Sequence, residues 1–155
     1  MRRVLLSLAA AAASVAVASP ALANEARVEG RGGVIWGSGD EEAIAGIAAG
    51  YDFDLGSTTF VGAEVTADKI LTSGTKVSFG FNGRVGAKLG DASKLYAVGG
   101  YNTEPCDLCD GTWGLGAGFQ QGFAQNLYGK VEYRHSFVDN FDDTDTVLVG
   151  LGTRF

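Results

Sequence analysis

The chain has 155 residues, including 24 Gly, 2 Pro, 2 Cys and a single His, and its formal net charge is −6. Gly is about twice as frequent as in an average protein but follows no three-residue period, which excludes a collagen-like fibre. An apolar share of 46% argues against a disordered chain. The acidic balance argues against nucleic acid as a partner, and one His excludes a histidine-rich metal or catalytic centre.

The first 23 residues have the three-part pattern of a secretory signal peptide. Met1-Arg2-Arg3 is basic, residues 4–18 are apolar apart from two Ser, and Ala21-Leu22-Ala23 is a small-x-small cleavage site. The apolar run is too short to span a membrane comfortably as a helix. We therefore expect cleavage after Ala23 and an exported domain of residues 24–155. Cleavage removes two Arg and no acid, which changes the net charge from −6 to −8.

The exported domain alternates apolar and polar residues with period two, which predicts β-strands with one apolar and one polar face. A helix over the same residues would scatter the apolar side chains around its axis, and each internal Gly would cost about 1 kcal/mol relative to Ala. Eight segments show this pattern, although Tyr96 and Val98 make the fifth the least regular. In chain order they are 26–36, 43–54, 58–68, 75–89, 94–103, 112–123, 127–137 and 146–155.

The connections between these segments alternate between tight and longer. Three are tight turns, at residues 55–57, 90–93 and 124–126, and four are longer, at residues 37–42, 69–74, 104–111 and 138–145. Short turns at one end and longer loops at the other predict an up-and-down antiparallel meander with an even number of strands.

Two kinds of eight-stranded barrel fit this pattern, because either face could be inside. A soluble barrel of the lipocalin type encloses its apolar face around a ligand, whereas a transmembrane barrel turns that face to lipid. Aromatic residues near strand ends favour the transmembrane barrel, because they suit two interfacial girdles. These are Trp36, Tyr51, Phe53, Trp113, Phe123, Phe137 and Phe155. The fold we predict is an all-β, eight-stranded antiparallel up-and-down transmembrane β-barrel, in which the first strand pairs with the eighth.

Three stretches of sequence resemble a known family. The final strand, with Val147, Val149, Leu151 and Phe155 on its apolar face, resembles the C-terminal assembly signal of Gram-negative outer-membrane barrels. Val131-Glu132-Tyr133-Arg134 and Val61-Gly62-Ala63-Glu64 are similar to segments of the opacity-protein, OmpA-like family of small barrels.

This resemblance implies a location in the cell outer membrane of a Gram-negative bacterium. The implied partners are outer-membrane lipid, lipopolysaccharide and the outer-membrane assembly machinery, and we expect a monomer. The short turns would lie in the periplasm and the longer loops outside. These loops are much shorter than the long, variable loops with which opacity proteins adhere.

If the polar face lines the lumen, the lumen carries a network of charges. Eight strands leave an interior that side chains just fill, so the network should plug the barrel with salt bridges. We expect Glu29, Glu64 and Glu132 to pair with the neighbouring bases. The excess of bases over acids would favour anions in any residual pore. The predicted network is Arg27, Glu29, Arg31, Asp52, Glu64, Arg84, Lys88, Lys130, Glu132, Arg134 and Arg154.

The two cysteines lie in one loop, as Cys106-Asp107-Leu108-Cys109. A thioredoxin-like redox motif needs a βαβ context, and a zinc site needs a second pair of ligands. Because exported thiols tend to pair, we predict a disulfide between Cys106 and Cys109, which contributes modestly to stability because it closes few residues.

Ten acids and no Lys or Arg lie in three of the longer loops. Their spacing does not match an EF-hand, so we predict a solvated acidic surface with at most weak binding of divalent ions. They are Asp40, Glu41, Glu42, Glu104, Asp107, Asp110, Asp139, Asp142, Asp143 and Asp145.

His135 and Ser136 are the remaining candidates for chemistry, because a lipid-facing His–Ser pair occurs in some barrel lipases. Adjacent strand residues point to opposite faces, so we expect the two side chains to lie on opposite sides of the wall. The sequence therefore predicts a non-enzymatic barrel with a structural or surface-interaction role, without cofactor or metal. The alternatives are a narrow passive pore, a periplasmic soluble barrel that binds an apolar ligand, and a lipid-modifying enzyme.

Overall fold

The computed structural model describes residues 24–37, 39–107, 109–138 and 142–155, and in them the backbone forms eight strands. The predicted signal peptide, residues 1–23, lies outside the described residues. In the described part of the chain, no helix is long and apolar enough to cross a membrane. The strands are β1 (Glu25–Gly37), β2 (Asp40–Asp54), β3 (Thr59–Ile70), β4 (Ser78–Leu89), β5 (Ser93–Asn102), β6 (Thr112–Gly122), β7 (Leu127–Phe137) and β8 (Thr144–Arg154).

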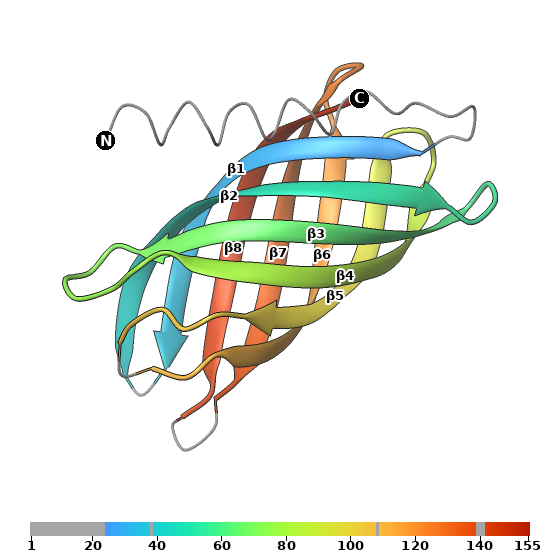
Figure 1. Ribbon diagram of the computed structural model, residues 1–155. Helices are drawn as coiled ribbons and strands as arrows, with labels where there is room; N and C mark the ends of the chain where they lie inside the picture. Colours follow the sequence, from blue (N-terminus) through green and yellow to red (C-terminus); the bar gives the residue numbers. More distant parts are fainter. Residues whose placement is uncertain (1–23, 38, 108, 139–141) are drawn as a thin grey trace.

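Every strand pairs antiparallel with its neighbours in sequence, and β1 also pairs with β8, so the sheet closes into a barrel (Figure 1). In the closing pair, Gly30 lies opposite Leu151 and Val34 opposite Val147. Closure leaves neither β1 nor β8 with an unpaired edge, which a strand in hydrocarbon requires. The predicted up-and-down barrel is confirmed.

The two ends of the barrel differ in their connections. Residues 55–58, 90–92 and 123–126 connect strands at one end, called here the turn end, where Phe155 also lies. Residues 38–39, 71–77, 103–111 and 138–143 connect strands at the opposite end, called the loop end. In Figure 1 the connection between β3 and β4 lies at the end of the barrel away from the C-terminus.

The connection between β1 and β2 is shorter than the sequence predicted. Asp40, Glu41 and Glu42 pair with Gly37, Trp36 and Ile35, so the expected loop over residues 37–42 is wrong. Gly39 adopts a φ of 95°, which a two-residue hairpin turn requires and which Gly accepts without steric cost. Three consecutive acids have a low preference for strands, but pairing with β1 overrides it.

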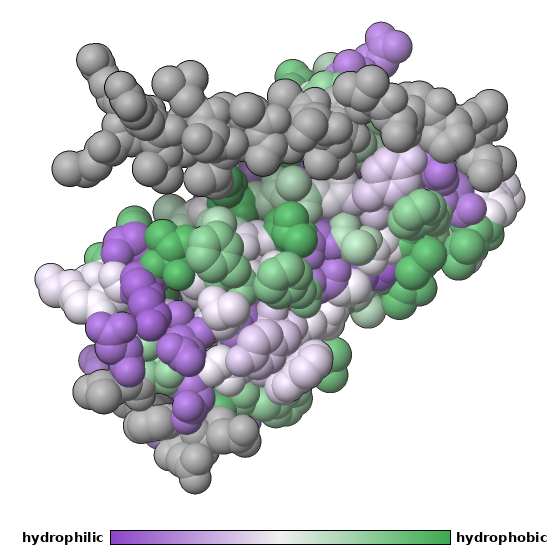
Figure 2. All heavy atoms as spheres, viewed as in Figure 1, coloured by the Kyte–Doolittle hydropathy of each residue, from purple (hydrophilic) through white to green (hydrophobic). Residues whose placement is uncertain are grey.

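The interior and exterior faces follow the predicted period-two pattern. Outward side chains such as Phe81, Leu115 and Leu151 are 61–67% exposed, whereas the charged Arg84 and Glu132 face the lumen and are 1–2% exposed. Apolar side chains therefore cover much of the visible wall (Figure 2). A soluble barrel needs the reverse arrangement, so the lipocalin-like alternative is wrong.

Aromatic side chains gather at both ends of the outer wall. At the loop end, Tyr101, Trp113 and Phe137 lie side by side on β5, β6 and β7, and the Tyr101 and Trp113 ring centroids are 5.4 Å apart. At the turn end, the Tyr51 and Phe53 rings pack at 4.8 Å. This is the distribution of two interfacial girdles around an apolar belt.

The least regular predicted strand, β5, has apolar residues on both faces. Tyr96 and Val98 point into the lumen, where they form a buried cluster with Phe60 of β3. The interior is therefore not wholly polar, which explains why period two is weak in this segment.

Candidate functional site

The lumen is the candidate site, because period two directs all eleven predicted charges into it. Nine of them are at most 7% exposed, whereas Lys88 and Arg154 lie nearer the turn end and pair with Asp54 and Glu25. The nine buried residues come from five strands: Arg27, Glu29, Arg31, Asp52, Glu64, Arg84, Lys130, Glu132 and Arg134.

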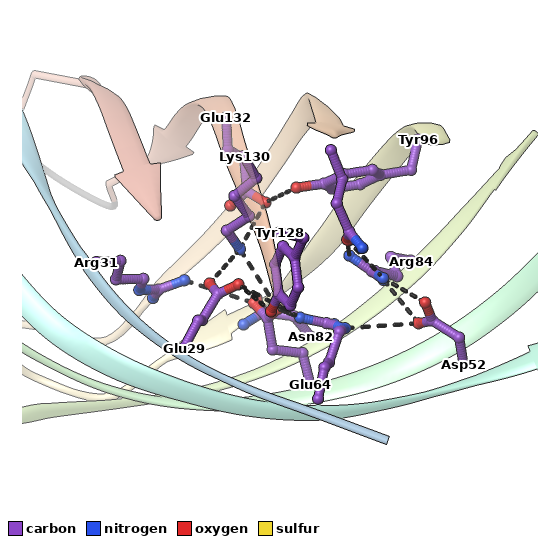
Figure 3. Close-up of polar contacts among 12 residues, drawn as sticks. Glu29, Arg31, Asp52, Glu64, Asn82, Arg84, Tyr96, Tyr128, Lys130 and Glu132 are labelled. Carbon is purple, nitrogen blue, oxygen red and sulfur yellow. Dashed lines mark hydrogen bonds and ion pairs between the residues drawn. The ribbon is translucent and has the colours of Figure 1, made fainter. Parts of the chain in front are cut away.

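Glu64 on β3 is the centre of the network (Figure 3). Its carboxylate accepts hydrogen bonds from Arg27 at 2.6 Å, Arg134 at 3.1 Å and Arg31 at 3.4 Å. Lys130 lies 3.6 Å from the same carboxylate. Four cations thus surround one buried acid, and other acids must balance them.

Glu132 and Glu29 supply part of that balance. Glu132 accepts hydrogen bonds from Arg134 at 2.5 Å, Lys130 at 3.3 Å and the Tyr96 hydroxyl at 2.7 Å. Glu29 lies 2.5 Å from Lys130 and accepts a hydrogen bond from the Tyr128 hydroxyl at 2.7 Å. Each tyrosine lies along the inner wall, over a glycine of the next strand (Gly118 or Gly152), and reaches an acid two strands away.

A second group of charges lies toward the turn end and centres on Asp52. Arg84 binds its carboxylate with two nitrogens, and Lys94 lies 3.0 Å away. The Arg84 guanidinium also stacks over the Tyr96 ring, 4.7 Å from the centroid. The Lys94 ammonium lies 5.0 Å from the Phe60 ring centroid, so the apolar cluster and the ion pairs are packed together.

Sequence reasoning missed four charged members of the lumen. Asp68 binds Arg31 with both carboxylate oxygens, Asp54 pairs with Lys88, and Lys94 donates to Glu25 at 2.7 Å. Asp68 has the same parity as Glu64, so period two could have placed it in the lumen. The pair between β5 and β1 joins residues 69 positions apart, which no local pattern shows.

These additions correct the predicted charge balance. The described lumen holds eight bases and seven acids rather than seven bases and four acids, so the excess of bases that favoured anions shrinks to one, and the preference for anions stays a prediction. The bases are Arg27, Arg31, Arg84, Lys88, Lys94, Lys130, Arg134 and Arg154, and the acids are Glu25, Glu29, Asp52, Asp54, Glu64, Asp68 and Glu132.

The lumen is hollow at both ends of the network. A cavity of about 610 Å³ lies at the loop end, above the Arg31–Asp68 pair and Arg134. A smaller one of about 230 Å³ lies at the turn end, beside Lys94 and Arg154. The prediction that side chains fill the whole interior is therefore wrong. Residues between the two cavities line neither of them: Arg27, Glu29, Asp52, Glu64, Arg84, Lys130 and Glu132.

The loop-end cavity has apolar walls. Ile35 on β1, Ile44 on β2, Ile70 on β3 and Leu148 on β8 contribute to it. All four share the parity of the lumen charges. The three isoleucines lie nearer the loop end than the charges on their own strands, whereas Leu148 lies opposite Glu132 of β7. Sequence reasoning overlooked this change from charged to apolar within one face.

The predicted disulfide is present between Cys106 and Cys109, whose Cα atoms are 5.1 Å apart. Their loop is tied to residues 71–77 by Lys76, whose ammonium lies 3.1 Å from Asp107 and 3.4 Å from Glu104. The hydrogen bond to Asp107 raises the pKa of Lys76 above its usual value, so this lysine stays protonated at neutral pH. The acidic loop is thus partly countered by a base from its neighbour.

His135 and Ser136 lie on opposite sides of the wall. Ser136 lines the loop-end cavity, whereas the outward His135 ring packs against Phe137 at 4.9 Å. His135 Nδ1 lies 2.9 Å from Asp145 and Nε2 lies 3.4 Å from Asp143. The acids near His135 therefore form ion pairs when it is protonated. Asp139 lies outside the described residues.

The predicted assembly-signal residues Val147, Val149, Leu151 and Phe155 alternate with the inward residues of the closing strand, Thr146, Leu148 and Gly150. Their recognition by the assembly machinery stays a prediction. Among the described residues, no three His, Cys, Asp or Glu side chains gather as a set that could hold a metal ion.

A closed barrel with an apolar belt, aromatic girdles and a charged interior defines the class of transmembrane β-barrels. No protein-family profile matches the chain. A curated relative, the 25 kDa outer-membrane immunogenic protein of Brucella ovis, is 30% identical over 127 residues. The match covers 72% of this chain but only 63% of that relative's length.

Solved structures agree on the fold. The attachment invasion locus protein Ail of Yersinia pestis matches with a TM-score of 0.61 and 15% identity, over 86% of this chain and 99% of Ail. Neisserial surface protein A matches with a TM-score of 0.60 and 11% identity, over 84% of this chain and 95% of that protein. The chain is a small eight-stranded β-barrel of the Gram-negative outer membrane, as its resemblance to opacity and OmpA-like barrels implied.

Proposed function

We propose that this chain is a closed, non-enzymatic outer-membrane barrel that presents an acidic, short-looped surface. The observation that carries this proposal is the network between the two cavities. Each of the eight lumen bases lies within 4 Å of a carboxylate, and the central residues are almost fully buried.

Opening a path through this network would be costly. Glu64 alone faces four cations, so moving it aside would leave several buried charges without a partner. Breaking a buried ion pair typically costs about 3–5 kcal/mol, and an ion passing through would break several at once. The network therefore acts as a plug rather than a selectivity filter.

A conductance measurement tests this proposal. The refolded protein, checked by its altered gel migration without heating, is added to a planar lipid bilayer at neutral pH. We expect a silent membrane at protein amounts at which a porin control conducts. Reproducible current steps that scale with protein amount would contradict the plug and support the second candidate, a narrow pore. That candidate draws on the two cavities, which leave only the central layer to be crossed.

The non-enzymatic part of the proposal draws on the placement of His135 and Ser136. A nucleophile and its base must lie within hydrogen-bond reach, and these two face opposite sides of the wall. Incubation of the folded protein with lipopolysaccharide, followed by mass spectrometry of lipid A, should show no loss of acyl chains. Deacylated product that disappears in a His135→Ala variant would contradict it.

The surface role draws on the loop end. The relative from Brucella ovis is described as immunogenic, and we propose that the loop end of this chain is likewise exposed outside the cell. Acids there suit divalent ions that bridge to lipopolysaccharide, with the barrel as a monomer and the turn end in the periplasm. Protease added to whole cells should cut within residues 103–111 and spare residues 90–92; the reverse pattern would contradict this orientation.

A further inference from the structure

The plug proposal gives no role to the loop-end cavity, which lies on the loop-end side of the ion network and has Arg31, Asp68 and Arg134 as its floor. Its volume of about 610 Å³ is within the roughly 300–1,000 Å³ typical of small-molecule sites. We propose that this cavity binds a small amphiphile with a compact apolar body and a cationic head. The proposal does not depend on whether the plug conducts.

The walls select an apolar body. Ile35, Ile44, Ile70 and Leu148 line one side of the cavity from four adjacent strands, and Val138 lies near the mouth. Polar groups in the wall are mostly hydroxyls, which hydrogen-bond without adding charge. Burying apolar ligand surface here is favourable, because water in contact with these side chains is released.

The floor does not offer a free charge to a ligand. Arg31 is bound by both oxygens of Asp68 and by Glu64. Arg134 donates to Glu132, Glu64 and Asn82. Because each guanidinium already has carboxylate partners, an anionic head would have to displace a buried acid to reach it. The floor therefore disfavours an anionic head. Which charge the ligand's head carries then depends on the residues at the mouth.

The mouth favours a cation. Asp110 and Asp142 line the cavity where it opens, and further acids surround them at the loop end. Acidic groups around a low-dielectric opening raise the local concentration of cations. The described loop-end connections contain one base, Lys76. A second base, Lys69, lies next to them near the end of β3. The described acids at this end are Asp40, Glu41, Glu42, Glu104, Asp107, Asp110, Asp142, Asp143 and Asp145.

The distribution of isoleucine allows a direct test. The chain has four Ile, of which Ile35, Ile44 and Ile70 line the cavity, whereas Ile47 faces outward and is 51% exposed. Methyl NMR of Ile-labelled protein in nanodiscs therefore reports on the cavity at three positions and on the membrane at one. Three probes share one apolar body and differ in charge: 1-adamantylammonium, 1-adamantanol and adamantane-1-carboxylate.

We expect saturable shifts at the three cavity methyls and none that saturate at Ile47. The ammonium should bind about tenfold more tightly than the carboxylate, with the alcohol between them, and the difference should shrink with added salt. No saturable shift at the cavity methyls would overturn the site. Equal binding of the three probes, or tightest binding of the carboxylate, would overturn the cationic specificity.

A matched pair of variants tests the role of the mouth. Asp110→Asn removes an exposed acid that lines the cavity, and Asp91→Asn removes an exposed acid at the turn end. Asp110→Asn should weaken the ammonium about threefold and leave the alcohol unchanged, because one of several acids is lost while the walls stay intact. An equal effect of Asp91→Asn, or no effect of Asp110→Asn, would contradict this role.

Discussion

Glu64 is the buried acid at the centre of the ion network in the lumen. It is 3% exposed and faces Arg27, Arg31, Lys130 and Arg134. A buried charge without a partner is strongly unfavourable, so the effect of removing Glu64 comes mainly from the cations it leaves behind.

Glu64→Gln should therefore destabilise the folded barrel by about 3–5 kcal/mol, the typical cost of breaking a buried ion pair. The matched control is Glu41→Gln, an exposed acid at the start of β2, which should change stability by less than about 0.5 kcal/mol. Urea unfolding in lipid vesicles, followed by tryptophan fluorescence, measures both. Equal stabilities of the two variants would mean that the network contributes little.

Gly118 leaves room for a tyrosine ring that lies along the inner wall of the barrel. It lies opposite Tyr96 on β5, and a Cβ at this position would meet the tyrosine ring and hydroxyl. That hydroxyl donates to Glu132, so the missing side chain preserves a contact of the plug.

Gly118→Ala should displace the Tyr96 ring and cost about 1–3 kcal/mol, as overpacking of a filled interior does. Gly30→Ala is the control, because a Cβ there meets nothing within 4 Å. The folded fraction on an unheated gel and the urea midpoint should fall for the first variant only. Matching losses in both would show that backbone freedom, rather than space, is what Gly118 provides.

At the scale of strands, period two predicted the elements well because one face of each strand meets lipid and the other meets charge. It failed where another interaction decided the structure. The acids from Asp40 to Glu42 pair with β1 despite their low strand preference, and Tyr96 and Val98 join an apolar cluster inside.

The contents of the lumen were harder to predict than its wall. The alternation of residues identified which charged side chains face the lumen. Which of them pair with one another depends on the strand register and on how far each side chain reaches inside the barrel. Tyr128 and Glu29, for example, are 99 positions apart in sequence and hydrogen-bond at 2.7 Å. The apolar cavity was missed because Ile35, Ile44, Ile70 and Leu148 interrupt an otherwise polar face one residue at a time.

The closing strand β8 supports a prediction about assembly. If Val147, Val149, Leu151 and Phe155 are read by the assembly machinery, Phe155→Ala should lower the amount of folded barrel in cells severalfold. The same variant should refold in detergent nearly as well as the wild type, because Phe155 is 62% exposed. Normal amounts in the outer membrane would show that Phe155 is not part of such a signal.

At the scale of the whole molecule, charge is divided between two regions. The lumen holds nearly equal numbers of bases and acids, while the acids that give the chain its negative charge lie at the loop end. Apolar side chains cover the wall between the ends. An acidic, glycine-rich composition thus describes a membrane protein whose polar groups are inside or at its rim.

The central claim is this placement of apolar residues outside and charged residues inside. Its most direct test uses the two Trp of the chain, Trp36 and Trp113, which lie on the outer face near the loop end. The account predicts that lipids brominated near the headgroup end of their acyl chains quench the fluorescence of the refolded barrel strongly, and that aqueous iodide quenches it weakly. Strong quenching by iodide with none by brominated lipid would contradict it.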